Sequence, residues 1–281
     1  MITQKKITCE NSRGEKISFG YFLPLWLKDA TGLTSAAYEV STQRQDGMDG
    51  ESWQSSCAQK RNIVITAAIK GEYAAQRERL FGFFQPRERG TLTYWEQGGR
   101  EKVIDYQVES VEFALQGKTR DVSISLICPY PLFRAPERSV VNMAYWEPLV
   151  RFPFVYGAPI MTARRIAERI VEVQNDQNVA CGLTITFVAR GPVKDPSLAE
   201  LGSGGKLALA LEMAEGDTVV VTTGRGQKRT LLNGVSHPEI WPLANDWIQL
   251  YPGKNTYQYG AKQGVEHLDV KLEYTLEYWG A

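Results

Sequence analysis

A period-two alternation of apolar and polar residues constrains the fold of this chain more than any other feature. From His267 to Tyr278 every second residue is a large apolar or aromatic one, and the residues between them are polar or charged. Successive side chains of a strand point to opposite faces, so this pattern predicts a final strand with one packed face and one face that is wet or at an interface. Shorter alternating runs occur at 63–65, 122–126, 183–187 and 207–211. The chain is therefore predicted to be mainly β.

Turn signals separate many of these runs in the second half of the chain. They contain Gly, which adopts the positive φ angles of tight turns, and lie at 215–217, 223–226, 233–234 and 251–253. Closely spaced short strands from about residue 180 onward favour a β-sandwich.

One segment, Glu72–Phe84, has helical rather than alternating spacing. Tyr73, Leu80, Phe81 and Phe84 fall on one predicted face, and Pro86 ends the run. We expect a helix laid across an N-terminal sheet. For Thr162–Ile170 a short helix and an extended segment are equally compatible with the sequence.

Prolines concentrate between Pro129 and Pro159, a density that argues against a continuous helix or a central strand. We therefore expect an N-terminal β domain over 1–135, a proline-rich connection over 136–170 and a sandwich domain over 171–281.

Charge and cysteine usage narrow the function classes. Lys+Arg and Asp+Glu both number 32, so the formal net charge is zero and offers no electrostatic footprint for nucleic acid or an anionic membrane. No apolar segment suits a signal peptide or a bilayer span, so we expect no membrane insertion and no secretion by that route. Four scattered cysteines, Cys9, Cys57, Cys128 and Cys181, are expected to be reduced thiols.

A Gly-rich turn at Gly202–Lys206 invites comparison with a phosphate-binding loop. The register fails, because Glu200 stands where the first Gly belongs, Leu207 replaces the metal-binding hydroxyl, and the segment that follows alternates like a strand. A structural loop is the better interpretation.

Other candidate sites are equally weak. His237 and His267 are the only histidines and lack a nucleophile signature nearby, so we expect a loop and a polar strand face, respectively. Asp46–Glu51 is acidic but lacks the ligand spacing of a calcium loop. We expect no catalytic residues, metal or cofactor, although a hydrolase with carboxylates from distant strands remains a third hypothesis.

An ordered series of short motifs in the second half resembles the distal tail protein family (Dit) of long-tailed phages. The series consists of 175–180, 183–187, 191–198, 207–209, 215–223 and 250–255. Gln177 departs from the family's usual Asn-x-Gly-Asp turn. The first half agrees more loosely, through 38–42, 46–50, 60–65, 77–84 and 91–94.

The resemblance implies an N-terminal β domain with one helix that forms a hexameric ring, followed by a galectin-like β-sandwich. Such a ring joins the tail tube protein to the baseplate hub at the virion tail tip, after assembly in the host cytoplasm. The partners that the resemblance implies are further copies of this chain, the tail tube protein and the hub or tail-associated protein. It leaves open whether rings stack and whether receptor-binding proteins are also partners.

A carbohydrate-binding module that contacts host-surface glycans is the alternative. Aromatic rings stack on the apolar faces of sugars, and Trp241, Trp247, Tyr257 and Tyr259 are the candidate residues.

Overall fold

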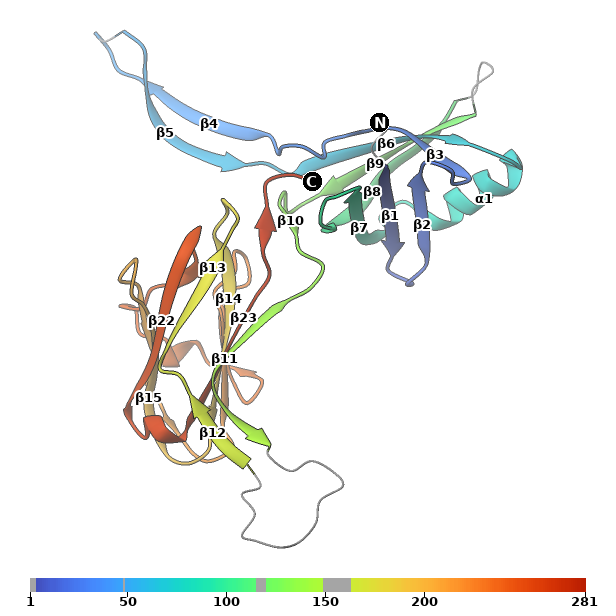
Figure 1. The fold of residues 1–281 in the computed structure, drawn as a ribbon. Coiled ribbons are helices and arrows are strands. Elements are labelled where there is room, and N and C mark those ends of the chain that lie inside the picture. Colours follow the sequence, from blue (N-terminus) through green and yellow to red (C-terminus); the bar gives the residue numbers. More distant parts are fainter. Residues whose placement is uncertain (1–3, 48, 115–119, 149–162) are drawn as a thin grey trace, which may run out of the picture. The chain divides into compact units, whose positions relative to one another are not determined.

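The computed structural model describes residues 4–47, 49–114, 120–148 and 163–281, and these form mostly strands. The chain divides into two compact units (Figure 1). Unit 1 consists of Met1–Pro136 together with Glu277–Ala281, and unit 2 consists of Glu137–Leu276. None of the described helices is long and apolar enough to cross a bilayer.

The main sheet of unit 1 has the strand order β2-β1-β7-β8-β9-β6-β3. These strands are β1 (Lys5–Asn11), β2 (Lys16–Gly20), β3 (Leu25–Thr31), β6 (Arg61–Ile69), β7 (Arg89–Glu96), β8 (Lys102–Phe113) and β9 (Asp121–Cys128). Only residues 21–24 join β2 to β3, the two ends of this order, so the sheet must curl to bring its edges within reach of that turn. Two short strands, β10 (Phe133–Arg134) and β24 (Glu277–Tyr278), pair with each other beside β8.

Alternation places the core of unit 1 on one face of its strands. In β6 the side chains of Ile63, Ile65 and Ala67 are buried while the residues between them are more exposed. The predicted helix is confirmed as α1 (Tyr73–Phe83). It buries Leu80 and Phe83 rather than Phe81, which lies on the exposed side against Phe113.

Unit 2 is a sandwich of two sheets. The larger has the order β12-β11-β23-β14-β18-β19-β20, with β21 beside β14, and the smaller has β13-β22-β15-β16, with β17 beside β15. Their strands are β11 (Ser139–Pro148), β12 (Ala163–Ala167), β13 (Ile170–Asn175), β14 (Cys181–Ala189), β15 (Val193–Glu200), β16 (Lys206–Ala208), β17 (Glu212–Met213), β18 (Thr218–Thr222), β19 (Arg229–Leu232), β20 (Val235–Ser236), β21 (Gln249–Leu250), β22 (Gly253–Gln263) and β23 (Leu268–Tyr274). Single turns of 3-10 helix lie at η1 (Pro238–Ile240) and η2 (Val265–His267). Phe187 and Val270 from the larger sheet share one buried cluster with Leu198 and Tyr257 from the smaller sheet.

The structure differs from the sequence-based expectation in the proline-rich segment. Residues 139–148 form β11, which lies between β12 and β23, so the described part of 136–170 contributes strands to the sandwich. Pro148 is the last paired residue of β11. Proline has no amide N–H to donate, but the strand pairing ends here, so no later hydrogen bond is interrupted. Of the two options for 162–170, the extended one is correct for its described residues, which contain β12. Pro153 and Pro159 lie outside the described residues.

The predicted final strand is in fact two strands. Leu268–Tyr274 pairs with β14 and β11 in unit 2, whereas Glu277 and Tyr278 pair with β10 in unit 1. Asp269, expected on a face that is wet or at an interface, is buried, and the Arg190 Nε donates a 2.8 Å hydrogen bond to its carboxylate.

Candidate assembly surfaces

Both histidines make local contacts. The His237 Nδ1 lies 2.6 Å from a carboxylate oxygen of its neighbour Glu239. His267 belongs to η2 rather than to the polar face of the following strand, and its ring packs where a side chain at position 191 would project, which explains Gly191. Among the described residues no three His, Cys, Asp or Glu side chains are grouped to hold a metal ion.

The backbone of the Gly202–Lys206 loop binds the carboxylate of Glu200 from the same chain. The amides of Gly202, Ser203 and Thr256 all donate to the buried carboxylate of Glu200. Burial opposes ionisation, but these hydrogen bonds outweigh it and lower the pKa of Glu200. The donors that a phosphate would need are therefore already used, and Lys206 begins β16 rather than a helix.

Cys9, Cys57 and Cys128 are free thiols in the structure, and the buried Cys181 thiol donates a 3.6 Å hydrogen bond to the Val179 carbonyl. Cys9 and Cys128 are buried in unit 1, and burial raises the pKa of Cys128 to about 12, so this thiol is a packing group rather than a nucleophile. Cys57 is exposed on β5 (Glu51–Ala58).

The aromatic residues proposed for glycan stacking do not form an open platform. Tyr257 and Tyr259 are buried in the core of the sandwich. Trp241 and Trp247 stack on each other at 4.0 Å with a 15° interplanar angle, and the Lys228 ammonium lies 5.2 Å from the Trp247 ring centre. Stacking on a sugar needs an uncovered ring face, which the buried Tyr257 and Tyr259 do not offer. Glycan binding stays a prediction, and these two tyrosines are no longer candidates for it.

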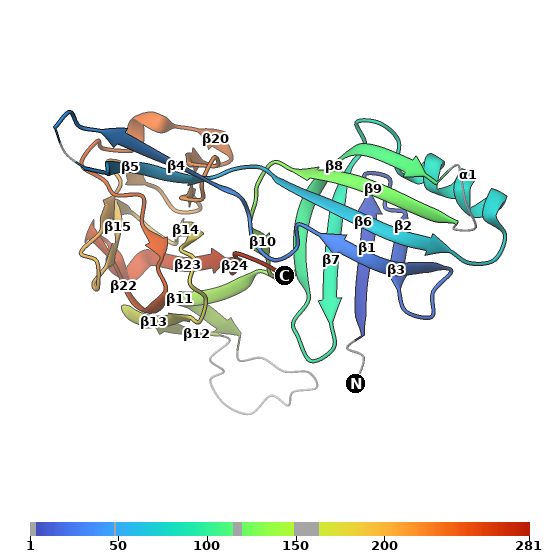
Figure 2. The ribbon, with the colours of Figure 1, turned by 90° about the horizontal axis from the view of Figure 1, so that it is seen from above.

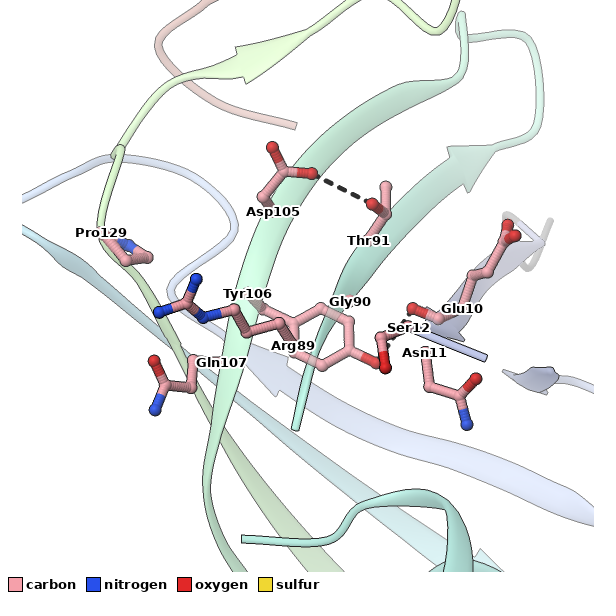
Figure 3. A pocket seen from close by; sticks show the side chains of 10 residues that line it. All are labelled: Glu10, Asn11, Ser12, Arg89, Gly90, Thr91, Asp105, Tyr106, Gln107 and Pro129. Atoms are coloured by element: carbon pink, nitrogen blue, oxygen red, sulfur yellow. Dashed lines mark hydrogen bonds between the residues drawn. The ribbon is translucent and has the colours of Figure 1, made fainter. Parts of the chain in front are cut away.

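An open hollow of about 570 Å³ lies on the unit 1 sheet. Figure 3 shows the Tyr106 ring crossing it toward Glu10, whose carbonyl accepts a hydrogen bond from the Tyr106 hydroxyl. The Asp105 carboxylate in its wall is paired with both terminal nitrogens of Arg134, at 2.6 and 2.8 Å. Gly90 is required beneath the ring, because a Cβ there would lie 2.1 Å from the Glu10 oxygen. These groups satisfy one another and stabilise the sheet.

Unit 1 contains a two-stranded hairpin whose residues are mostly exposed. It consists of β4 (Tyr38–Arg44) and β5 (Glu51–Ala58), and it pairs with no other strand in the part of the chain that the structure describes. Figures 1 and 2 both show it running beyond the sheet that contains β3 and β6. The acidic segment Asp46–Glu51 lies at its turn, where the Thr42 hydroxyl donates to the Glu51 carboxylate; Met48 lies outside the described residues.

One face of this hairpin is apolar. Tyr38 and Val40 point to the same side of β4, and Trp53 joins them because it pairs with Thr42 across a β-bulge. Their exposed fractions are 46%, 56% and 68%, respectively. We call Tyr38, Val40 and Trp53 the hairpin's apolar face. The sequence carries a signal for it, since residues 38–42 alternate, but alternation does not tell an exposed apolar face from a core face.

A further exposed aromatic residue, Phe22, lies in the turn between β2 and β3. Phe22 is 85% exposed and has a φ of 65°, a left-handed conformation that costs energy for a bulky residue. Its neighbour Trp26 is covered by the Lys70 ammonium, 3.3 Å from the ring centre, and by the edge of Tyr21. The exposure of Phe22 was not predicted from the sequence.

Comparison with known families places both halves of the chain in phage tails. Residues 12–128 match the family described as the phage tail protein RIFT-related domain, and residues 176–278 match the siphovirus-type tail component, C-terminal domain. The chain belongs to the siphovirus distal tail protein family. As a member of that family, it is a structural component of a phage tail.

The crystal structure of SPP1 Dit shares the fold of this distal tail protein. The crystal structure of SPP1 Dit (gp 19.1), described as a paradigm of the hub adsorption apparatus in phages that infect Gram-positive hosts, is 16% identical. The match covers 97% of this chain and 99% of that one, with a TM-score of 0.69. A chain of the phage P2 baseplate in its activated conformation with Ca is 10% identical, with 98% of each chain covered and a TM-score of 0.46. A search among curated proteins found no relative that matches this distal tail protein.

Proposed function

We propose that this distal tail protein forms a six-membered ring that joins the tail tube to the baseplate hub at the virion tail tip. Its partners are five further copies of itself, the tail tube protein on one face of the ring and the hub or tail-associated protein on the other. In this proposal unit 1 forms the ring, unit 2 is a galectin-like sandwich, and the working parts are surfaces rather than catalytic residues.

The exposed hairpin carries the proposal. A two-stranded hairpin alone is at best marginally stable in water, because it has no sheet face to bury. The hairpin of β4 and β5 forms a separate two-stranded sheet among the described residues, yet it presents three large apolar side chains on one side. A surface on another molecule would bury them.

A second copy of the chain supplies that surface in a way that fits a ring. The hairpin is one patch and its docking surface is a different patch, so the contact is heterologous, and heterologous contacts close into rings when the rotation between copies allows it. Zero formal charge removes net repulsion between the copies.

Light scattering coupled to size exclusion tests the proposal. A mass six times the 31.6 kDa of one chain supports a single ring, and twice that mass supports stacked rings. A single-chain mass at every concentration would contradict self-assembly through the hairpin.

A further inference from the structure

The last five residues of the chain are bound at several points of unit 1. Tyr278 pairs with Phe133 through β24 and β10. The Lys102 ammonium donates a 2.8 Å hydrogen bond to the Gly280 carbonyl, and the Tyr130 hydroxyl donates a 2.7 Å hydrogen bond to the Glu277 carboxylate. Strand pairing and side-chain hydrogen bonds therefore both attach this segment to unit 1.

The segment 277–281 also contacts the two stretches of chain that connect the hairpin to the rest of unit 1, which we call the legs of the hairpin. We define the hairpin root as residues 32–38, which lead into β4, and residues 58–61, which follow β5. The legs are closed by a 2.8 Å hydrogen bond from the Gln59 amide to the Ala37 carbonyl. On the first leg, the Ala281 amide donates to the Leu33 carbonyl at 2.9 Å, and the Trp279 ring packs on Tyr38 with ring centres 5.5 Å apart.

Arg61 connects the second leg to the same segment. Its side chain is only 2% exposed, and its guanidinium donates to the carbonyls of Pro131, Gly32, Leu33 and Trp279. All of these hydrogen bonds reach main-chain oxygens, and the Phe133 ring centre lies 5.0 Å from the guanidinium carbon. Loss of an acceptor would leave part of a buried cation unpaired, which is costly. A shift of the Trp279 carbonyl would therefore also disturb Arg61, which binds the carbonyls of the first leg as well.

Gly280 allows this close approach. A Cβ at this position would lie 1.9 Å from the Thr34 carbonyl oxygen, so any other residue would push the segment away from the first leg.

We propose that residues 277–281 are a clasp that fixes the direction of the hairpin, and that Arg61, Trp279 and Gly280 are positioning residues for assembly. The clasp holds both legs of the root, while β4 and β5 pair with no further strand among the described residues. This inference rests on the proposed function, because a fixed direction matters when the hairpin must reach a neighbouring copy.

Hydrogen exchange of the root tests the clasp separately from the ring. The variant is Gly280→Ala, and the matched control is Gly82→Ala, where a Cβ meets no atom within 4 Å. Exchange is followed by mass spectrometry on peptides that contain Gln59, at a concentration at which light scattering shows single chains. We expect root exchange to be faster by about tenfold in Gly280→Ala and unchanged in the control, with peptides of β14 unchanged in both.

A milder variant guards against unfolding of Gly280→Ala. Trp279→Ala removes only the ring that packs on Tyr38, and we expect faster root exchange, by about threefold, with a smaller share of ring on size exclusion. Root exchange equal to that of the wild type in both variants would overturn the clasp, even if the ring forms. A wild type that never assembles would instead contradict the proposed function while the exchange result still decides the clasp.

Discussion

Trp53 is expected to be the strongest single contributor to self-assembly. A fully covered aromatic side chain of this size buries up to about 250 Å², so an exposed fraction of 68% leaves about 170 Å² for a neighbour to cover. At about 25 cal/mol per Å² this burial contributes at most about 4 kcal/mol. Side-chain ordering and polar desolvation offset part of it, so we expect Trp53→Ser to cost about 2 kcal/mol per contact, roughly a 30-fold weaker association.

Sedimentation velocity over a series of concentrations measures this effect. The midpoint between single chains and rings should move to higher concentration in Trp53→Ser. The matched control is Leu243→Ser, which also removes a fully exposed apolar side chain but lies in unit 2. We expect the control to assemble like the wild type.

Thermal unfolding of the dissociated chains separates assembly from folding. Trp53 buries little within its own chain, so Trp53→Ser should unfold at the wild-type temperature under conditions that keep both as single chains. An unchanged assembly midpoint in Trp53→Ser would refute the argument that the hairpin's apolar face joins the copies.

Three further predictions concern stability, each measured by urea unfolding of single chains. Glu200→Gln should lower the free energy of unfolding at neutral pH by about 1–3 kcal/mol, because the backbone amides lose a charged acceptor. The pKa of Glu200 is lowered in the folded state, so its contribution is present above the unfolded-state pKa and is lost as pH falls through the folded-state pKa; the difference should shrink between about pH 7 and pH 3. Phe22→Asn should raise the free energy of unfolding by about 0.5–1 kcal/mol, since Asn tolerates a positive φ better. Gly182→Ala should lower it by about 1–3 kcal/mol because a Cβ would lie 2.3 Å from the Gly224 Cα, whereas Gly224→Ala, with open space around its Cβ, should change it little.

Each of these has an outcome that contradicts it. A pH-independent difference between wild type and Glu200→Gln would show that ionisation of this carboxyl is not coupled to folding. A less stable Phe22→Asn would mean that contacts of the ring exceed the backbone strain. Equal losses in Gly182→Ala and Gly224→Ala would show that the close approach at β14 relaxes without cost.

Much of the fold follows from local pattern. Alternation identified the strands around Ile63, Val122 and Ile185, and helical spacing identified α1, because side-chain direction along a strand or helix is set by the local backbone. Helical spacing misplaced Phe81 and did not include Phe83, since the helix is short and its buried side depends on which sheet residues it meets.

The candidate assembly surfaces could be predicted less well from the sequence than the strands and the helix. Tyr38 and Val40 alternate like core residues, and only the absence of a covering layer leaves them exposed. The role of Arg61 has no local signal at all, because its acceptors come from residues 32–33, Pro131 and Trp279.

By itself the sequence determined that the chain is mainly β with one helix, and that an ordered set of turn and strand motifs resembles the distal tail family. These properties depend on the period of apolar residues and on turn chemistry, which act over a few residues. The tertiary structure alone decided that the alternating run from Leu268 to Tyr278 is shared between two units, and that the hairpin has a bare apolar face. A period of two says which side of a strand each residue occupies, but pairing partners and burial depend on segments distant in the chain.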